Sequence, residues 1–438
     1  MRRIDFSGKR GLDELRTALV DWATGAEVSA DVAALLAEIR SQGDDALLRL
    51  TERFDQARLE ASQLRVPAGE LAAAEAALAP AAREAMEEAI ASVRFFHGQS
   101  RPQSWLLPNP HGAEVGERYY PLRRVGLYIP GGQAPLVSTV IMTAVPAVVA
   151  GCREIVVCTP PRPDGSIDAH LLAALSLVGV EEVYRLGGVQ AIGGMAYGTD
   201  TVPAVDKLFG PGNAYVNEAK RQLFGVCGVD LLPGPSEVLV IADAGADPAW
   251  VAADLIAQAE HGTHKEKVFL VTLAAPGLLA AVEAELAQQA PQRRAAAEVQ
   301  SVLDHRAVAI EASTVDEAVQ AANLIAPEHL ELLVGELRQA ELMEKITTAG
   351  AFLLGYQTPT VLGDFVAGPS HTLPTDTTAR FSGGIQTVDF MRRSSVVRFP
   401  SASLAKVWPT VKTFAELERL DGHGESLRRR VEAEPRSQ

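Results

Sequence analysis

The feature that most constrains the fold of this chain is an alternation of short β-branched runs with helix-like patterns, which begins at Val125. Strand candidates lie at residues 126–129, 154–158, 182–186, 207–209 and 229–232. Helical patterns lie between them, at residues 138–150, 169–177, 190–197 and 214–224. Because strands that are buried on both faces and joined by crossover helices form parallel sheets, residues 126–235 are predicted to form one doubly wound α/β domain.

A second series of the same kind follows, with strand candidates at residues 237–242, 268–273, 308–312, 330–334 and 351–354. It predicts a second α/β domain, and we assign the helical patterns of residues 30–98 to its N-terminal part. Residues 117–122 are expected to form a strand that leads into the next unit. The predicted division is therefore a docking segment at 1–23, a discontinuous domain at 24–125 plus 236–380, a second domain at 126–235, and a mainly helical segment at 381–438.

The two terminal segments are too short to bury a core of their own. The C-terminal one offers a strand candidate at residues 395–399 and helical patterns at 404–420 and 426–434. Both segments are expected to dock on a larger body. The sequence leaves open whether that body is the same subunit or the partner in a dimer.

The composition disfavours several classes of protein. The chain has 438 residues and a formal net charge of −15, whereas nucleic-acid binding relies on clustered Lys and Arg. Its three cysteines form no CxxC pair, which favours a reducing compartment. The N-terminus lacks the apolar stretch of an export signal, and the most apolar segment, residues 137–150, contains Pro146 and is too short to span a bilayer. We expect a cytoplasmic protein with no membrane or nucleic-acid partner.

Residues 247–264 are predicted to contain one helix that Asp247 caps and Gly262 ends. Gln258 and His261 are three residues apart and would project side by side near its C-terminal end, with Asp254 one turn behind. Two nitrogen or oxygen ligands at that spacing can share a metal. The same residues also fit the polar face of an amphipathic helix.

Glycine-rich loops follow three of the strand candidates in the domain at 126–235, at residues 128–132, 186–190 and 209–213. Glycine permits close approach of the backbone, and the helix N-termini that follow present free N–H groups to an anion such as a pyrophosphate. None of the loops has the pattern GxGxxG. Any one of them could simply turn the chain, but three in one domain favour a nucleotide-like ligand.

Carboxylate and imidazole side chains recur together at three further places. Asp364 and His371 lie in a long Gly/Pro-rich loop, where a metal or a substrate would give the backbone a reason to be ordered. Glu328 and His329 are adjacent, and such a pair can act as general acid and base, although a surface Glu-His would have the same sequence. Residues 418–423 contain another acid and His423, which also fit a solvated helix end.

Taken together, six motifs resemble those of the histidinol dehydrogenase family, zinc enzymes of the last two steps of histidine biosynthesis. They lie at residues 128–132, 209–214, 233–243, 258–261, 326–332 and 363–371. The resemblance runs from about residue 30 to about residue 425. It implies two incomplete Rossmann-like domains, oxidation of L-histidinol through L-histidinaldehyde to L-histidine with two NAD, one Zn²⁺ per subunit, and a homodimer in which the C-terminal segment completes the partner's site.

The resemblance also implies roles for residues of this chain. The zinc ligands would be Gln258, His261, Asp364 and His423, the last from the other subunit. Glu328 and His329 would be the acid/base pair. Ser236, Glu328, His371 and Glu418 would join the zinc ligands in holding the substrate. Contacts with NAD would come from Tyr128, Gln190 and Asn213.

The chain departs from the family pattern beside the predicted loops, at Phe365, Ser370, Gly262 and Gln133. A paralogue that oxidises another polar or amino alcohol with NAD and zinc therefore stays an alternative. A metal-dependent hydrolase is the alternative from another class, because zinc plus a glutamate base also describes hydrolytic sites. A two-domain binding protein fits the two lobes but gives Glu328 and His329 no purpose.

Overall fold

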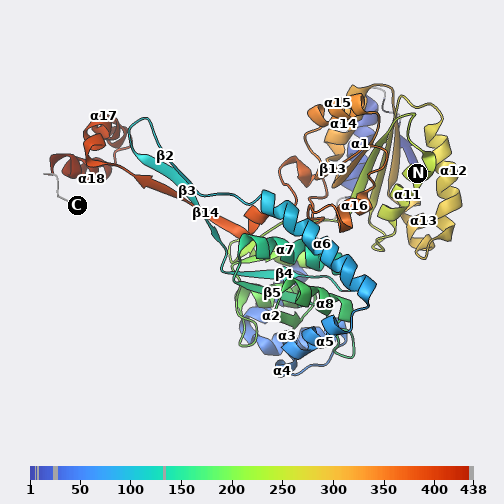
Figure 1. Cartoon of the computed structure of the whole chain (residues 1–438), viewed down its shortest axis with the longest axis horizontal. Coiled ribbons are helices and arrows are strands. Elements are labelled where there is room, and N and C mark those ends of the chain that lie inside the picture. Colours follow the sequence, from blue (N-terminus) through green and yellow to red (C-terminus); the bar gives the residue numbers. More distant parts are fainter. Residues whose placement is uncertain (5, 7–8, 23–27, 132–134, 434–438) are drawn as a thin grey trace. The chain divides into compact units, whose positions relative to one another are not determined.

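The computed structural model describes residues 1–4, 6, 9–22, 28–131 and 135–433. The chain divides into two compact units, one made of Met1–Ser100 with Leu122–Phe390 and the other of Arg101–Pro121 with Met391–Gln438. The first unit holds two parallel sheets with helices on their faces. This confirms the predicted α/β fold of two doubly wound sheets (Figure 1).

The larger sheet has six parallel strands in the order β1-β11-β10-β9-β12-β13. Their bounds are β1 (Arg2–Ile4), β9 (Glu237–Ala242), β10 (Lys267–Leu273), β11 (Ala307–Ala312), β12 (His329–Leu333) and β13 (Ala351–Leu354). The central strands β9, β10 and β12 are buried along their whole length, because helices cover both faces. The strand β9 is the point at which the order of strands reverses. The strands β10 and β11 are added on one side of it, and β12 and β13 on the other.

Two apolar layers fill the space between this sheet and its helices. One layer joins the sheet to α11 (Pro248–Ala259), α12 (Leu278–Gln289) and α13 (Ala296–His305), with the short η1 (Ala290–Gln292) between the last two. The other joins it to α1 (Lys9–Trp22), α14 (Val315–Ile325) and α15 (Glu336–Lys345). The helix α16 (Thr360–Phe365) follows β13.

The N-terminal residues dock on their own chain. The strand β1 extends the six-stranded sheet by pairing with β11, and Leu15 of α1 is fully buried in the apolar layer with α14. An edge strand and a single helix cannot bury a core alone, so they use the core of the larger body. Of the two possibilities that the sequence left open for this segment, the described residues show the intramolecular one.

The smaller sheet has five parallel strands in the order β6-β5-β4-β7-β8. Their bounds are β4 (Arg124–Tyr128), β5 (Glu154–Thr159), β6 (Glu182–Arg185), β7 (Lys207–Phe209) and β8 (Gly228–Val229). The crossover helices are α7 (Val137–Ala150), α8 (Ala169–Val178), α9 (Gly188–Tyr197) and α10 (Ala214–Leu223). The strand β8 is shorter than the predicted strand at 229–232, because the chain already leaves the sheet before Pro233.

The helices that precede this sheet in the sequence cover it as well. They are α2 (Ser29–Gln42), α3 (Asp44–Asp55), α4 (Ala61–Leu64), α5 (Ala68–Ala76) and α6 (Pro80–Gln99). Leu36, Leu47 and Leu50 are buried in one apolar cluster with Tyr184 and Ile192 of the five-stranded lobe. This packing differs from the predicted grouping of residues 24–125 with 236–380. The periodicity of a helix shows which of its faces is buried but not which sheet buries it.

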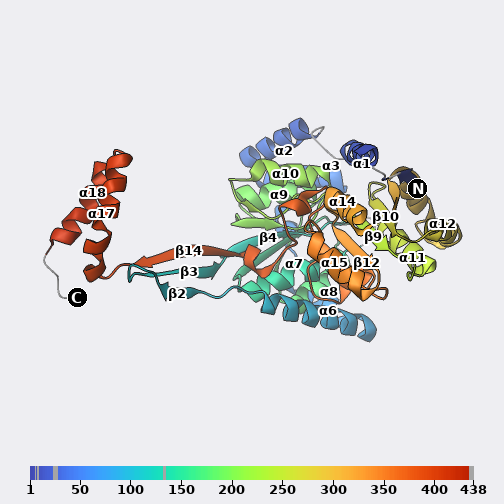
Figure 2. The same ribbon diagram turned by 90° about the horizontal axis from the view of Figure 1, so that it is seen from above.

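The second unit contains an antiparallel sheet and two helices (Figure 2). The sheet has the order β14-β3-β2, with β2 (Trp105–Pro108), β3 (Glu114–Pro121) and β14 (Met391–Arg398). Residues 117–122 were expected to lead into the parallel sheet, but β3 pairs instead with β14 from the far end of the chain. The helices α17 (Ser401–Leu417) and α18 (Asp421–Glu432) pack on each other.

Residues 366–390 belong to the first unit and contain the short η2 (Thr378–Arg380) and η3 (Thr387–Phe390). Phe390 stacks on Phe209 with ring centroids 3.9 Å apart, and the Lys207 ammonium donates to the Asp389 carbonyl over 2.9 Å. This segment therefore packs on the five-stranded lobe. Over the part of the chain that the structure describes, no helix combines the length and the apolarity that crossing a bilayer requires.

Candidate active site and nucleotide pocket

The amino ends of β9 and β12, which are neighbours in the six-stranded sheet, carry three of the predicted site residues. Ser236 immediately precedes β9, Glu328 precedes β12, and His329 is the first residue of β12. All three lie at the amino edge of the sheet, and Glu328 follows closely on the end of α14.

Glu328 is held by two donors to one carboxylate oxygen. The Ser236 hydroxyl donates to Oε2 over 2.5 Å, and the Glu237 backbone N–H donates to the same atom over 2.8 Å. Burial raises the pKa of Glu328 well above its ordinary value, and these two hydrogen bonds oppose that rise. The side chain is therefore fixed in place and tends to keep a proton.

His329 lies beside Glu328 with the opposite tendency. Its Nδ1 is 3.8 Å from Glu328 Oε2, too far for a hydrogen bond, and has no hydrogen-bond partner among the described residues. Burial lowers the pKa of His329 to about 3, and the charges of His371 and His261 act in the same direction. The imidazole is therefore neutral near pH 7, which leaves an unprotonated ring nitrogen beside a carboxyl group whose pKa is raised.

The helix α16, which contains Asp364, and the loop that follows it, which contains His371, bring these two residues to the same place, so Asp364 lies on a helix and not in the predicted loop. Asp364 Oδ1 lies 3.6 Å from His329 Nε2, and burial raises the pKa of Asp364 to about 6. His371 Nδ1 is 3.3 Å from the Asp364 carbonyl oxygen, while its Nε2 is 3.3 Å from the Thr139 hydroxyl at the start of α7. The predicted site residues of the six-stranded lobe thus meet the N-terminal turn of α7, the helix that follows β4 in the five-stranded lobe.

Gln258 and His261 lie near the end of α11, which is capped as predicted by Asp247. The sequence predicted a helix that continues to Gly262 and includes His261. The helix ends at Ala259 instead, so His261 lies just beyond it. His261 Nδ1 donates to the Gln258 carbonyl oxygen over 2.9 Å, which leaves Nε2 available to a ligand. The Gln258 side chain is buried, and its amide nitrogen has no hydrogen-bond partner among the described residues.

The chemistry of these donor groups suits a metal ion. An imidazole nitrogen oriented by a carbonyl, a buried amide and the buried Asp364 carboxylate form a nitrogen and oxygen set of the kind that catalytic zinc accepts. His261 also acts electrostatically on Asp364, His329 and His371, so these side chains share one site. Over the described residues no group of three His, Cys, Asp or Glu is arranged to hold a metal.

Asp254 does not point into this set. It lies against Glu331 of β12, and burial raises the pKa of both carboxyl groups. Glu331 also accepts the backbone N–H and the hydroxyl of Thr360, over 2.6 and 2.7 Å. The other two predicted residues, Glu418 and His423, belong to the second unit, and their roles stay predictions.

A buried charge cluster beside the site was missed by the sequence analysis. Lys267, at the start of β10, forms ion pairs with Glu237 and Asp376. Since Glu237 supplies one of the backbone donors to Glu328, the cluster secures the strand end that holds the carboxyl group. The three residues are far apart in the sequence, and no local pattern connects them.

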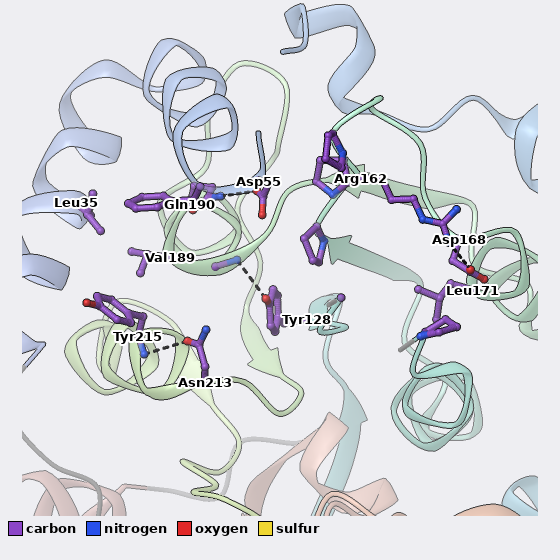
Figure 3. A pocket seen from close by; sticks show the side chains of 17 residues that line it. Leu35, Asp55, Tyr128, Arg162, Asp168, Leu171, Val189, Gln190, Asn213 and Tyr215 are labelled. Atoms are coloured by element: carbon purple, nitrogen blue, oxygen red, sulfur yellow. Dashed lines mark hydrogen bonds and ion pairs between the residues drawn. The ribbon is translucent and has the colours of Figure 1, made fainter. Parts of the chain in front are cut away.

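The three residues predicted to contact NAD line one pocket of about 650 Å³ at the carboxyl edge of the five-stranded sheet (Figure 3). Tyr128 ends β4, and its hydroxyl accepts the Gly188 N–H over 3.2 Å. Asn213 caps α10 by accepting the N–H groups of Tyr215 and Val216. Gln190 lies in the first turn of α9. Helix N-termini that converge in this way suit an anionic group.

Two glycine-rich loops that flank the pocket meet in the middle of the sheet. Gly210 has φ +112°, and a Cβ built on it would lie 2.1 Å from the Tyr128 carbonyl oxygen. Only glycine permits this approach. Gly132 and Gln133, in the loop after β4, lie outside the described residues.

Comparison with known proteins agrees with this arrangement. The family model described as histidinol dehydrogenase matches residues 22–431. A histidinol dehydrogenase of Symbiobacterium thermophilum is 43% identical over 92% of this chain and 91% of its own, and one of Gluconobacter oxydans is 42% identical over 99% and 100%. The crystal structure of histidinol dehydrogenase from Elizabethkingia anophelis has a TM-score of 0.92, 32% identity and 98% coverage of both chains. The chain belongs to the histidinol dehydrogenase family.

Proposed function

We propose that this protein oxidises L-histidinol to L-histidine with two molecules of NAD, in a zinc-dependent reaction. The observation that carries the proposal is the buried pair Glu328 and His329, whose pKa values move in opposite directions beside the Ser236 hydroxyl. Pairs of titratable groups shifted apart in this way mark acid and base roles. The nearby pocket lined by Tyr128, Gln190 and Asn213 is large enough for a dinucleotide.

In the first oxidation the alcohol carbon loses a hydride to NAD and the hydroxyl loses a proton. His329 is neutral and has an unpaired buried nitrogen, so it accepts this proton. The products are the aldehyde, NADH and one proton, which leaves the site before the next step. His371, fixed between Thr139 and the Asp364 backbone, helps to orient the substrate.

In the second oxidation water adds to the aldehyde, and the hydrate loses a hydride to a second NAD. Glu328 in its carboxylate form takes the proton of the attacking water, while Ser236 holds the carboxylate in position. The products are the acid, a second NADH and a second proton. Water is consumed once, so atoms and electrons balance over the two steps.

Gln258, His261 and Asp364 would hold the zinc ion, together with His423 from the second unit of a partner subunit. A bound Zn²⁺ would anchor the amine and imidazole of the substrate and so fix its alcohol carbon. The chain would then act as a homodimer, with Glu418 also completing the substrate site. We place it in L-histidine biosynthesis, in the cytoplasm.

The test is to count NADH per histidinol with the zinc-loaded full-length protein. Two NADH per L-histidinol, abolished by a chelator and restored by zinc, would support the proposal. If the protein binds NAD and zinc but forms no NADH from L-histidinol, the substrate is another amino or polar alcohol. If the protein does not bind NAD but hydrolyses a substrate in a zinc-dependent reaction, the alternative of a metal-dependent hydrolase would be supported instead.

A further inference from the structure

One acidic side chain in the dinucleotide pocket has no role in the function described above. Asp55, the last residue of α3, lines the pocket together with Phe54, Leu35 and Val189. Its carboxylate accepts the Gln190 amide N–H over 2.9 Å, and burial raises its pKa to about 6. An acid in such apolar surroundings is costly, so this position calls for an explanation.

The pocket is built to hold that carboxylate. Gly187 lies against it, and a Cβ on Gly187 would come within 2.8 Å of Asp55 Oδ1. The Gly187 backbone also lowers the pKa of Asp55 through a hydrogen bond. The Gln190 side chain is almost fully buried, and its Oε1 has no hydrogen-bond partner among the described residues. One carboxylate and one unpaired amide oxygen therefore offer acceptors to a ligand.

The pocket offers little to a phosphate group beyond the pyrophosphate of a dinucleotide. Of the described residues that line it, only Asp55, Arg162 and Asp168 are charged. Arg162 is already paired with Asp168, Nη2 to Oδ2, over 2.7 Å. The lining therefore carries an excess of negative charge, and its cation is neutralised.

Asp55 and Asn213 lie on opposite sides of the pocket, and Asn213 is on the side that leads to the acid/base site. Figure 3 shows Asp55 and Gln190 on one side, Asn213 on the other and Tyr128 between them. Asn217, on the helix that Asn213 caps, donates to the Pro233 carbonyl, and the chain runs from Pro233 to Ser236 of the acid/base site. The nicotinamide must reach that site, so the adenosine must extend toward Asp55.

We propose that Asp55 is a specificity-determining residue that accepts hydrogen bonds from the adenosine ribose hydroxyls and excludes a 2′-phosphate, which makes the protein select NAD over NADP. This inference rests on the proposed use of a nicotinamide dinucleotide. A hydroxyl gains a charge-assisted hydrogen bond from the carboxylate, whereas a phosphate meets a like charge with no free cation nearby. Gln190 positions the carboxylate and supplies a second acceptor.

The experiment compares kcat/KM for NAD and NADP in the zinc-loaded wild type, Asp55→Asn and Glu52→Gln. Glu52 carries the same charge on the same helix and is exposed, but it does not line the pocket. We expect a wild-type preference for NAD of at least about a hundredfold, which Asp55→Asn reduces roughly tenfold or more and Glu52→Gln leaves unchanged. A wild type that uses both dinucleotides equally, or an unchanged preference in Asp55→Asn, would overturn the inference.

A binding measurement keeps the inference testable if Asp55→Asn does not fold. Calorimetric titration of the wild type and of Asp55→Glu with ADP-ribose and with its 2′-phosphorylated form requires no turnover. We expect both proteins to bind ADP-ribose more tightly than its 2′-phosphorylated form, because both retain the negative charge at position 55. Equal binding of the two ligands by the wild type contradicts the role of Asp55. If histidinol yields no NADH while ADP-ribose is still preferred, the proposed reaction fails and the pocket inference stands.

Discussion

His329 Nδ1 lies 3.8 Å from Glu328 Oε2, and burial shifts the pKa values of these adjacent side chains in opposite directions. Glu328 tends to keep its proton and His329 tends to stay neutral, so the two do not form an ion pair at rest. Separate proton positions allow separate tasks. Under the proposed function, each residue of the pair would serve one of the two oxidations.

Substitution of the two residues should separate the two oxidations. If Glu328 acts on water in the second step, as we propose, Glu328→Gln should slow aldehyde oxidation by about 10²- to 10⁴-fold. NADH formation should then stop near one NADH per histidinol. His329→Gln should slow the first step by a similar factor and leave aldehyde supplied directly as the better substrate. Stopped-flow NADH formation from each substrate measures both effects.

Zinc content is the control for these two variants. Both should bind zinc as the wild type does, because the proposed ligands are Gln258, His261, Asp364 and His423. His261→Ala is the matched comparison and should lose the metal. Loss of zinc from Glu328→Gln or His329→Gln would show that the residue is a ligand and not an acid or base.

Ser236→Ala should move the acid limb of the pH-rate profile for aldehyde oxidation to higher pH. The Ser236 hydroxyl donates to Glu328 Oε2, which lowers the pKa of Glu328, so its removal raises that pKa. A smaller fraction of Glu328 is then ionised at a given pH. Ser236→Thr keeps a hydroxyl and should restore the limb. If the acid limb of Ser236→Ala does not move but its KM rises, Ser236 contributes only to substrate binding.

The position and extent of most strands could be predicted because strands buried on both faces have a distinct local composition. Residues 207–209, 237–242 and 351–354 form strands within the predicted bounds. The sheet that each helix covers could not be predicted, since an amphipathic helix carries no label for its partner. For the same reason β3 could not be assigned to β14, because their pairing joins residues at opposite ends of the chain.

Candidate site residues could be named from the sequence where a short motif holds them together, as at Glu328 and His329, or where a family motif contains them, as at Asp364. The structure brings these residues close together, and their roles stay predictions. Lys267 and Asp55 could not be found in this way. Lys267 meets Asp376 from another part of the chain, and Asp55 reaches the pocket only because α3 packs beside α9. Their chemistry depends on long-range packing that no periodicity records.

His97 should make stability fall on acidification. It is fully buried on α6, and burial lowers its pKa from 6.5 to about 4. Between these values the unfolded chain binds a proton that the folded chain does not, so stability rises with pH across this window and falls as pH drops. From about pH 7 to about pH 5 the loss amounts to about 2 kcal/mol.

Thermal melting at both pH values checks this effect. His97→Gln should melt with a smaller difference between them than the wild type, whatever its stability at neutral pH. His305→Gln is the control, since His305 is exposed at the end of α13. Equal pH dependence in the wild type and His97→Gln would contradict the assignment.

Gly210→Ala should damage both the five-stranded sheet and its pocket. The new Cβ would lie 2.1 Å from the Tyr128 carbonyl oxygen, and φ is +112°. The strand ends of β4 and β7 must then separate, and Tyr128 and Asn213 move apart with them. Gly179→Ala is the matched control, because Gly179 also has positive φ, at +89°, but no heavy atom lies within 4 Å of its added Cβ. Backbone strain alone costs about 1 to 2 kcal/mol.

The difference between the two variants therefore measures the close contact rather than the strain. Gly210→Ala should lose at least about 2 kcal/mol more than Gly179→Ala in the free energy of unfolding, as expected for overpacking of a buried contact. It should also bind ADP-ribose more weakly, whereas Gly179→Ala binds it normally. Equal losses in the two variants would mean that the loop at Gly210 relaxes away from Tyr128, so that the pocket does not depend on the contact between the two strand ends.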